Sequence, residues 1–318
     1  MIAFDEKIRL IRNLAKHATP DSEHMDVIAR IAGCKPPYAP CGSFACVVCG
    51  PGMGDEFLGM TSRFMRIRRS KAGKEEDWKF VTIAPSPILA LRERWKLRPH
   101  EGRRHKLPAE VKSEIERKAR KAGITTLIGA LDFSYNEDGR QDKIAAGEAF
   151  ESHWSIHMHG FVPADQLTPQ VVRALRGMFP RSDEVPKPVD IQDFDGNPRA
   201  IAYSIKPEIL RRVTIMGSSR DRKGQPRLAR NTRYRPLRPQ QEAELRLMLD
   251  RMAMRDRLVL VGVKLCDNGS KRWFAPRSSL VTASLPKRSC RPAGPRSLSG
   301  TANRSTLSRR SAFGIPTW

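Results

Sequence analysis

Residues 151–162 read Glu-Ser-His-Trp-Ser-Ile-His-Met-His-Gly-Phe-Val, and this stretch decides the fold. Polar and apolar residues alternate with the period of two typical of a β-strand, which places His153, His157 and His159 on one face. Two imidazoles two residues apart on a strand face can bind one divalent cation, and Gly160 leaves room for a backbone or ligand to approach. The stretch therefore predicts a metal or catalytic site. The alternative is a half-buried strand whose histidines face solvent or a polar neighbour.

The charge balance predicts a polyanionic partner. Lys and Arg number 58 against 34 Asp and Glu, which gives a net charge of +24 and an isoelectric point of about 10.4. Nucleic acid is the leading candidate, ahead of an anionic membrane surface, because no long basic amphipathic helix is evident. No apolar run approaches the roughly 18 residues of a membrane-spanning helix, and the N-terminus lacks a signal-peptide layout. We therefore expect a cytoplasmic protein with no membrane partner and with reduced cysteines.

A cysteine-rich segment, residues 34–60, follows two helices predicted within residues 1–33. Four thiols fall within 16 residues, which favours tetrahedral zinc over disulfides in a cytosolic chain: Cys34, Cys41, Cys46 and Cys49. The C-x2-C pair is a usual chelating turn, but the other two spacings are not those of a standard zinc finger. His24 is an alternative ligand. The competing interpretation is a set of small buried thiols.

Residues 79–210 are predicted to form the central α+β domain. Its elements in order are strand 79–84, helix 108–122, strand 124–135, the polar turn 136–149, the His strand, a helix from Thr168-Pro169 to about Phe179, and strand 189–194. This is the β-α-β-β-α-β order of the split βαβ (ferredoxin- or RRM-like) plan, an antiparallel sheet with two helices on one face. The plan places the His strand centrally and leaves the other face open for a ligand. A further helix from Pro198 carries Tyr203 and Lys206.

The rest of the chain is basic. Residues 61–77 are expected to be solvated, and residues 285–318, with seven Lys or Arg and no acid, to be a disordered tail. Residues 211–284 are predicted to be a DNA-binding extension with a helix over 240–257 and a strand over 258–265. Its candidate DNA-binding residues are Arg211, Arg212, Arg220, Arg222, Lys223, Arg227, Arg230, Arg233 and Arg235.

Asp132 is the candidate third metal ligand. An antiparallel hairpin places it opposite about His157, within reach of the histidine row. His153 and Glu151 share that face by parity and are alternatives, and a plain surface acid is the competing interpretation of Asp132. Two histidines and a carboxylate with open positions suit Mn²⁺, with Mg²⁺ as the other candidate, and such an ion polarises a bound phosphate.

Tyr203 and Lys206 are the candidate catalytic residues. They stand at i and i+3 of one predicted helix, so their side chains project together. A nearby metal ion or the Lys206 cation would favour the phenolate and stabilise negative charge that develops on an attacked phosphate. A single tyrosine on a helix is otherwise most often a packing residue.

Together these motifs resemble the HUH endonucleases, named for His-hydrophobe-His, and among them the single-tyrosine initiators of rolling-circle plasmid replication. The matching stretches are Phe80-Val-Thr-Ile83, His157-Met158-His159 and Tyr203-Ser-Ile-Lys206. Ala130-Leu-Asp-Phe-Ser-Tyr135 resembles the strand that often carries an acid in the family, and a Cys-rich N-terminal stretch is also frequent there. The resemblance covers roughly residues 34–210. The sequence departs from it at Gly160, where the family has an aliphatic residue.

The resemblance implies a nicking-joining reaction on single-stranded or extruded origin DNA. A divalent ion held by His157 and His159 orients the scissile phosphate, and Tyr203 attacks it. The products are a 5′-phosphotyrosyl link and a free 3′-OH, while Lys206 steadies the tyrosine or the phosphate. No Gly-x4-Gly-Lys-Ser/Thr motif is present, so a host helicase and a polymerase are the implied partners.

Four other functions compete with this interpretation. A mobilisation relaxase and a transposase belong to the same class. Relaxases usually place the tyrosine ahead of the His motif, and some transposases carry two tyrosines. A non-enzymatic, zinc-dependent nucleic-acid-binding protein explains the charge and the cysteines but not the His row. A metal-dependent hydrolase uses the His row without covalent chemistry.

Overall fold

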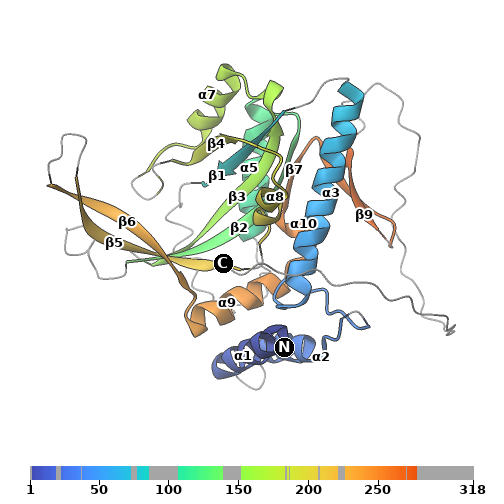
Figure 1. Cartoon of the computed structure of the whole chain (residues 1–318), viewed down its shortest axis with the longest axis vertical. Coiled ribbons are helices and arrows are strands. Elements are labelled where there is room, and N and C mark those ends of the chain that lie inside the picture. The colour runs from blue at the N-terminus through green and yellow to red at the C-terminus, as the bar shows by residue number, and fades with distance from the viewer. Residues whose placement is uncertain are drawn as a thin grey trace.

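The computed structural model describes residues 2–18, 23–36, 38–72, 77–85, 107–138, 152–182, 185, 187–206, 208–220, 226–269 and 271–277 (Figure 1). The helices are α1 (Ile2–His17), α2 (Glu23–Gly33), α3 (Cys49–Ala72), α5 (Leu107–Lys121), the short 3-10 helix η1 (Ala164–Gln166), α7 (Pro169–Met178), α8 (Pro198–Tyr203), α9 (Pro239–Asp250) and α10 (Met254–Arg257). The strands are β1 (Trp78–Ile83), β2 (Leu127–Asp138), β3 (His153–Pro163), β4 (Val189–Asp193), β5 (Leu210–Arg220), β6 (Pro226–Pro236), β7 (Leu258–Val261), β8 (Val263–Asp267) and β9 (Arg272–Pro276). The prediction of an α+β protein is confirmed.

The main sheet has the strand order β4-β1-β3-β2-β5-β6, and β7 pairs with the first half of β2. The His-bearing strand β3 lies between β1 and β2 and is antiparallel to both. The four strands predicted within residues 79–210 pair antiparallel with one another, whereas β5 runs parallel to the last residues of β2 and makes the whole sheet mixed. Segments that follow residue 210, expected as an extension, therefore supply three strands of the same sheet: β5, β6 and β7.

Two glycines let β2 and β3 approach closely behind the histidines. Gly129 is the register partner of Gly160. A Cβ built on Gly160 would lie 2.8 Å from the Gly129 Cα and 2.8 Å from the Ile128 carbonyl oxygen, closer than real Cβ contacts allow. The space that the sequence assigned to Gly160 is thus used by a neighbouring backbone, which explains why an aliphatic side chain is absent there.

The long helix α3 differs from the sequence expectation, which left residues 61–77 as a solvated basic segment. Its apolar side chains Phe57, Met60, Phe64 and Met65 are buried, and the Phe64 ring packs edge-on against Trp78 of β1 at 6.5 Å. The basic residues occupy the other side of the helix: Arg63 and Arg66 are exposed. The segment is thus amphipathic, and the packing of its apolar side against the sheet stabilises it as a helix.

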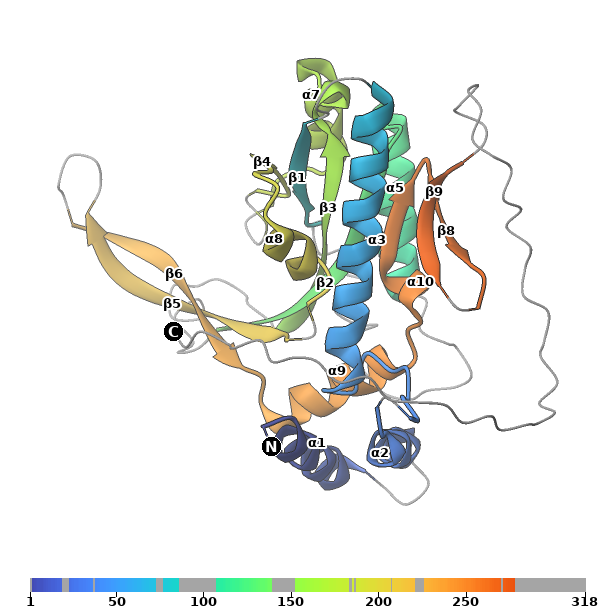
Figure 2. The same ribbon diagram turned by 45° about the vertical axis from the view of Figure 1, so that its right-hand side comes forward.

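The N-terminal helices form a separate layer at one end of the molecule. Figure 2 shows α1 and α2 beside α9, at the end opposite α7. The Asn13 side-chain amide of α1 donates to the Glu242 carboxylate of α9 at 2.8 Å, and the Lys7 ammonium donates to the carbonyl of Cys34 at 2.9 Å, just beyond the end of α2. No helix among the described residues has both the length and the apolarity to cross a membrane.

Candidate active site

Strand register gathers three candidate ligands on one sheet face. Asp132 of β2 pairs directly with His157 of β3, as the hairpin argument predicted, and His159 pairs with Thr82 of β1 on its other side. One ligand atom from each of Asp132, His157 and His159 lies within 4.8 Å of the others. The face predicted to be open is closed at this point, since Asp132 is 0% exposed and His159 is 7% exposed.

Asp132 Oδ2 lies at the centre of the site. It lies 3.2 Å from His157 Nε2, 3.6 Å from His159 Nε2 and 2.7 Å from Lys206 Nζ. Although burial would raise the pKa of Asp132, the adjacent His157 and His159 side chains and the Lys206 ammonium hold it well below its usual range. Asp132 is therefore a buried carboxylate anion.

The orientation of His159 is fixed by strand β1. Its Nδ1 lies 2.9 Å from Thr82 Oγ1, and its ring stacks on Phe80 at 5.6 Å with an interplanar angle of 11°. When Nδ1 donates to the threonine oxygen, Nε2 keeps its lone pair and faces Asp132. Burial lowers the pKa of His159, which favours the neutral imidazole that a metal ion requires. The sequence analysis did not assign these supporting roles to Phe80 and Thr82. The two residues alternate along β1, and Thr82 is the register partner of His159, so both lie on the face of the histidines.

These residues fit a divalent cation. Asp132 Oδ1 and His159 Nε2 are buried and have no hydrogen-bond partner among the described residues. Polar atoms left without partners in a protein interior are costly, and a bound ion would satisfy both. Two imidazoles and one carboxylate are a donor set that Mn²⁺ accepts.

Tyr203 and Lys206 close over the histidines from the end of α8. Asn197 caps this helix, since its side-chain oxygen accepts from the Arg199 backbone N–H at 2.9 Å. Tyr203 is the last helical residue, its ring centroid lies 5.1 Å from that of His159, and it is 47% exposed. Lys206 Nζ lies 4.0 Å from the centroid of the Tyr203 ring. The helix therefore ends with the tyrosine between the buried ligands and solvent.

The charge of Lys206 is held by its neighbours. Burial disfavours the ammonium, but the Asp132 carboxylate and contact with Tyr203 outweigh this and raise the pKa of Lys206 above its ordinary value. The site thus contains a fixed cation between the buried carboxylate and the phenol ring.

Arg257 lies on the opposite side of β2 and was not anticipated from the sequence. It is 0% exposed, donates to the Leu131 carbonyl through Nη2 at 2.9 Å, and stacks its guanidinium over Phe44 at 4.7 Å. Burial lowers its pKa to about 10, and the Asp132 charge opposes that shift. This fully buried cation next to the Asp132 backbone supports the negative charge on Asp132.

The four cysteines of the N-terminal segment form a second group. One Sγ from each lies within 4.8 Å of the others, and the distances from Cys49 Sγ are 3.4 Å to Cys34 and 3.6 Å to Cys41. A tetrahedron with Zn–S bonds of about 2.3 Å has edges of about 3.8 Å, so the sulfurs are spaced as four ligands of one ion would be. Burial raises the pKa of Cys41, and a bound cation would reverse that effect. His24 lies on α2 outside this group.

Other predicted site residues lie elsewhere. His153 pairs with Asn136 and lies 3.4 Å from its side-chain amide, and it does not join the Asp132 group. Glu151 and the tail 285–318 lie outside the described residues. Of the predicted DNA-binding residues, Arg211 and Arg212 are partly buried while Arg233 and Arg235 are exposed, and the side chains of Arg220, Arg222, Lys223, Arg227 and Arg230 lie outside the described part of the chain.

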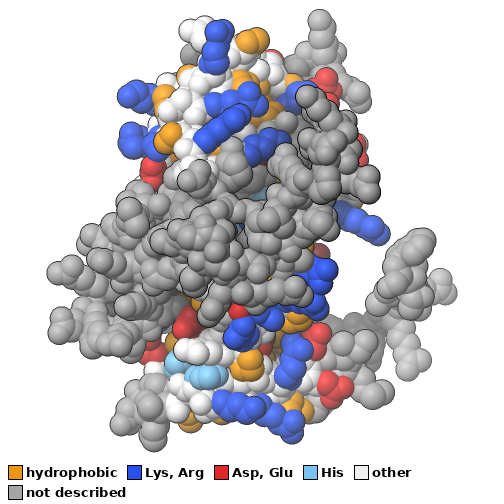
Figure 3. Space-filling model, turned by 90° about the vertical axis from the view of Figure 1, so that its left-hand side faces the viewer, with side chains coloured by type: hydrophobic (Ala, Val, Ile, Leu, Met, Phe, Trp, Pro, Cys, Tyr) orange, Lys and Arg blue, Asp and Glu red, His pale blue; other side chains and the backbone are white. Residues whose placement is uncertain are grey.

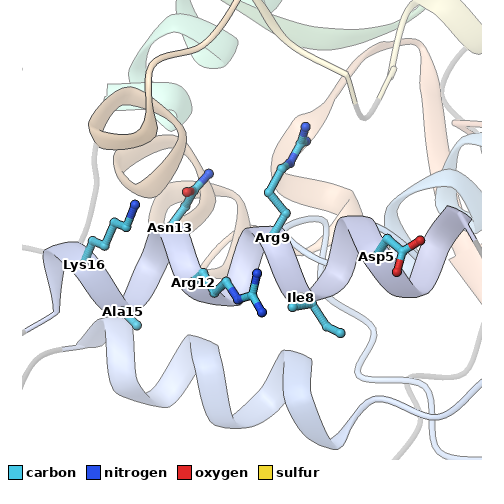
Figure 4. A pocket seen from close by; sticks show the side chains of 7 residues that line it. All are labelled: Asp5, Ile8, Arg9, Arg12, Asn13, Ala15 and Lys16. Atoms are coloured by element: carbon cyan, nitrogen blue, oxygen red, sulfur yellow. The ribbon is translucent and has the colours of Figure 1, made fainter.

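A shallow hollow on α1 is separate from both groups. Figure 4 shows its lining, which contains none of the candidate residues: Asp5, Ile8, Arg9, Arg12, Asn13, Ala15 and Lys16. Comparisons of this chain with protein-family models, with curated proteins and with solved structures found no match.

Proposed function

We propose that the protein is an HUH-type nicking enzyme that initiates rolling-circle replication through a covalent tyrosine intermediate. The observation that carries this proposal is the juxtaposition of Asp132, His157, His159, Lys206 and Tyr203, drawn from two adjacent strands and one helix end. A buried ligand set beside a half-exposed phenol is an arrangement suited to phosphoryl transfer. In this proposal the unit β1-α5-β2-β3-α7-β4, with its strand order β4-β1-β3-β2, is a split βαβ domain.

The metal ion in this proposal is Mn²⁺ or Mg²⁺, held by Asp132, His157 and His159. When bound, it polarises the scissile phosphate and makes its phosphorus more electrophilic. The protein contributes orientation: Thr82 and Phe80 fix His159, and the buried Arg257 supports the charge on Asp132. Such fixed surroundings are what a site with defined ligand geometry needs.

The proposed reaction is a transesterification. The Tyr203 Oη forms a bond to phosphorus while the bond from phosphorus to the 3′ oxygen breaks, and the proton lost from Tyr203 is balanced by the proton that the 3′ oxygen gains. The number of phosphodiester linkages is conserved, so no other reactant is consumed. Lys206 lies beside the Tyr203 ring, where its charge would stabilise the negative charge that develops on the attacked phosphate. The exposure of Tyr203 leaves it accessible to a single strand of DNA.

The cysteine group is proposed to bind a structural zinc ion. Its four sulfurs come from the end of α2, the following loop and the first turn of α3. A closed set of four thiolates leaves no open position for a substrate, which distinguishes it from the Asp132 group.

The test of the proposed function is a covalent capture experiment. Protein and Mn²⁺ are incubated with a labelled pool of random-sequence single-stranded DNA, and the mixture is resolved under denaturing conditions. Wild-type protein is expected to give a protein–DNA adduct that requires the metal. Tyr203→Phe is expected to reduce it by at least about a thousandfold, because the nucleophile is lost. Tyr38→Phe is the matched control, since Tyr38 is 92% exposed and far along the chain from the site.

The other outcomes assign the competing functions. Metal-dependent cleavage that survives Tyr203→Phe indicates a hydrolase. DNA binding with neither cleavage nor adduct indicates a non-enzymatic nucleic-acid-binding protein. Either result overturns the nicking proposal.

A further inference from the structure

The strands β5 and β6 form an arm that projects from the sheet. Their register runs from Leu210 paired with Pro236 to Arg220 paired with Pro226. Only Arg211 to Thr214 of β5 also pair with β2, so the pairs from Ile215 outward belong to a two-stranded ribbon with no third strand among the described residues. Figures 1 and 2 both show this ribbon extending away from the rest of the molecule. At about 3.3 Å per residue, its six outer pairs are roughly 20 Å long.

The composition of the arm does not support a packed core. Residues 211–238 contain ten Lys or Arg and one acid, and the large aliphatic residues between 215 and 231 are Ile215, Met216 and Leu228. At the inner part of β6, Arg233 and Arg235 are exposed and Tyr234 is 62% exposed. An isolated two-stranded hairpin is marginally stable in water, and dense positive charge makes it less so. A polyanion along the ribbon would remove that repulsion.

The base of the arm is fixed to the strand that carries Asp132. Glu137 of β2 is 8% exposed, its carboxylate lies 3.0 Å from Arg211 Nη1, and it also pairs with Arg238 after β6. Glu137 follows Asp132 by five residues, which corresponds to roughly 17 Å along the strand. Both ends of the arm are therefore held at a fixed distance from the candidate active site. This distance of roughly 17 Å corresponds to about five base pairs of DNA at about 3.4 Å per pair.

We propose that the β5–β6 arm is a groove-binding ribbon that grips double-stranded DNA next to the single strand at the active site. The inference rests on the proposed nicking function for the choice of DNA. A major groove about 12 Å wide admits a two-stranded β-ribbon, whereas the deep, narrow major groove of an RNA duplex does not. Figure 3 shows the face from which the arm projects, and Lys and Arg side chains lie at the α7 end of that face, with the sign of charge that a polyanion requires.

The test compares binding to three probes by fluorescence anisotropy: a DNA duplex of about 20 base pairs, a single strand of the same length, and an RNA duplex. The wild-type protein is expected to prefer the DNA duplex. Arg233→Gln/Arg235→Gln is expected to weaken duplex binding by about tenfold and to lower the slope of log affinity against log salt by about two, because two phosphate contacts are lost. The control Arg63→Gln/Arg66→Gln removes the same charge from exposed positions on α3 and is expected to leave the slope unchanged.

A second variant tests the ribbon as a whole. Replacing residues 216–230 with Asn-Gly joins Ile215 to Asn231, which are register partners, by a two-residue hairpin turn. Its thermal unfolding is expected to match that of the wild type, while the preference for duplex over single strand is lost. Equal loss of binding to single strand and duplex, unchanged duplex binding, or equally tight binding to the RNA duplex would overturn the ribbon proposal. The adduct experiment is independent of these readouts, so either proposal can fail while the other stands.

Discussion

Asp132 is the residue on which the candidate site depends. A carboxylate with 0% exposure is costly unless it is paired, and this one has two imidazoles and an ammonium around a single oxygen. The Lys206 ammonium lies closest, at 2.7 Å from Oδ2. A divalent ion held by the same oxygen would meet a like charge at that position. In the proposed site Lys206 would therefore have two opposing effects: its charge would stabilise negative charge that develops during attack by Tyr203, and it would disfavour the metal ion.

This opposition gives a prediction for Lys206→Met. Loss of the ammonium is expected to tighten Mn²⁺ binding by about tenfold, which corresponds to about 1.4 kcal/mol, because one positive charge next to the ligand oxygen is removed. Adduct formation on single-stranded DNA is expected to fall in the same variant. Titration calorimetry with Mn²⁺ measures the first effect and denaturing gels the second.

Lys187→Met is the control for the calorimetry. Lys187 also pairs with a carboxylate, Asp190 at 2.5 Å, but its side chain is 66% exposed and lies outside the ligand group. Its replacement is expected to leave Mn²⁺ affinity unchanged. Weaker Mn²⁺ binding in Lys206→Met would show that Lys206 supports the metal-binding carboxylate rather than competing for it.

At the scale of single elements, the sequence predicted those strands and caps that carry strong local patterns. The alternation in β3 and the β-branched run in β2 were sufficient to place Asp132 opposite His157. Thr168 accepts from the Val171 N–H as the cap of α7, as the Thr-Pro pair indicated. The predicted strand over 258–265 is divided at Gly262, where a φ of +64° ends β7 before β8 begins.

Two elements were missed for physical reasons. Helix α3 contains Gly50, Gly52, Gly54 and Gly59, and each glycine in a helix costs up to about 1 kcal/mol relative to alanine. Burial of its Phe and Met side chains against the sheet overrides that cost, and no local pattern reveals such packing. The sequence of the arm lacks an alternation of apolar and polar residues, and its strands are recognised in the structure by their pairing with each other. Contacts between distant segments, such as Arg257 behind β2, also leave no local signal.

The cysteine group connects two helices, and the proposed zinc ion can be tested through its effect on them. It joins the end of α2 to the start of α3, and the Arg246 guanidinium of α9 donates to the Ala45 carbonyl within the loop at 3.2 Å. Purified protein is expected to contain one zinc per chain by mass spectrometry, and Cys41→Ser to lose it. Hydrogen exchange is then expected to rise in α1, α2 and α9 and to stay unchanged in β1, β2 and β3, since the proposed structural ion would contribute folding energy locally.

Cys266→Ser is the matched control for that experiment. Cys266 is buried in β8 and does not belong to the four-sulfur group, so its replacement is expected to leave the zinc content unchanged. Full zinc content in Cys41→Ser, or faster exchange in the central strands, would contradict the assignment of a structural clamp between the helices.

At the scale of the whole molecule, the net charge of +24 opposes folding. A compact chain brings like charges together, and the arm and the exposed arginines of α3 add to that repulsion. Some of the charge is compensated locally, as where Glu137 pairs with Arg211 and Arg238. The excess positive charge is not compensated. Added salt would weaken both the long-range repulsion, a change that stabilises the folded state, and the ion pairs, a change that destabilises it.

Salt is therefore expected to stabilise the free protein. Raising sodium chloride from about 0.01 M to about 0.1 M shortens the Debye length from about 30 Å to about 10 Å, which screens long-range repulsion more than it screens buried, contacting pairs. A gain of about 1 kcal/mol corresponds to a rise of about 2 °C in Tm for a chain of this size, measurable by differential scanning fluorimetry. Sucrose of equal osmolality is the control, because it adds no charge. A fall in Tm with salt would mean that ion pairs such as that of Glu137 outweigh the repulsion, and the excess charge would then need no polyanion to be tolerated.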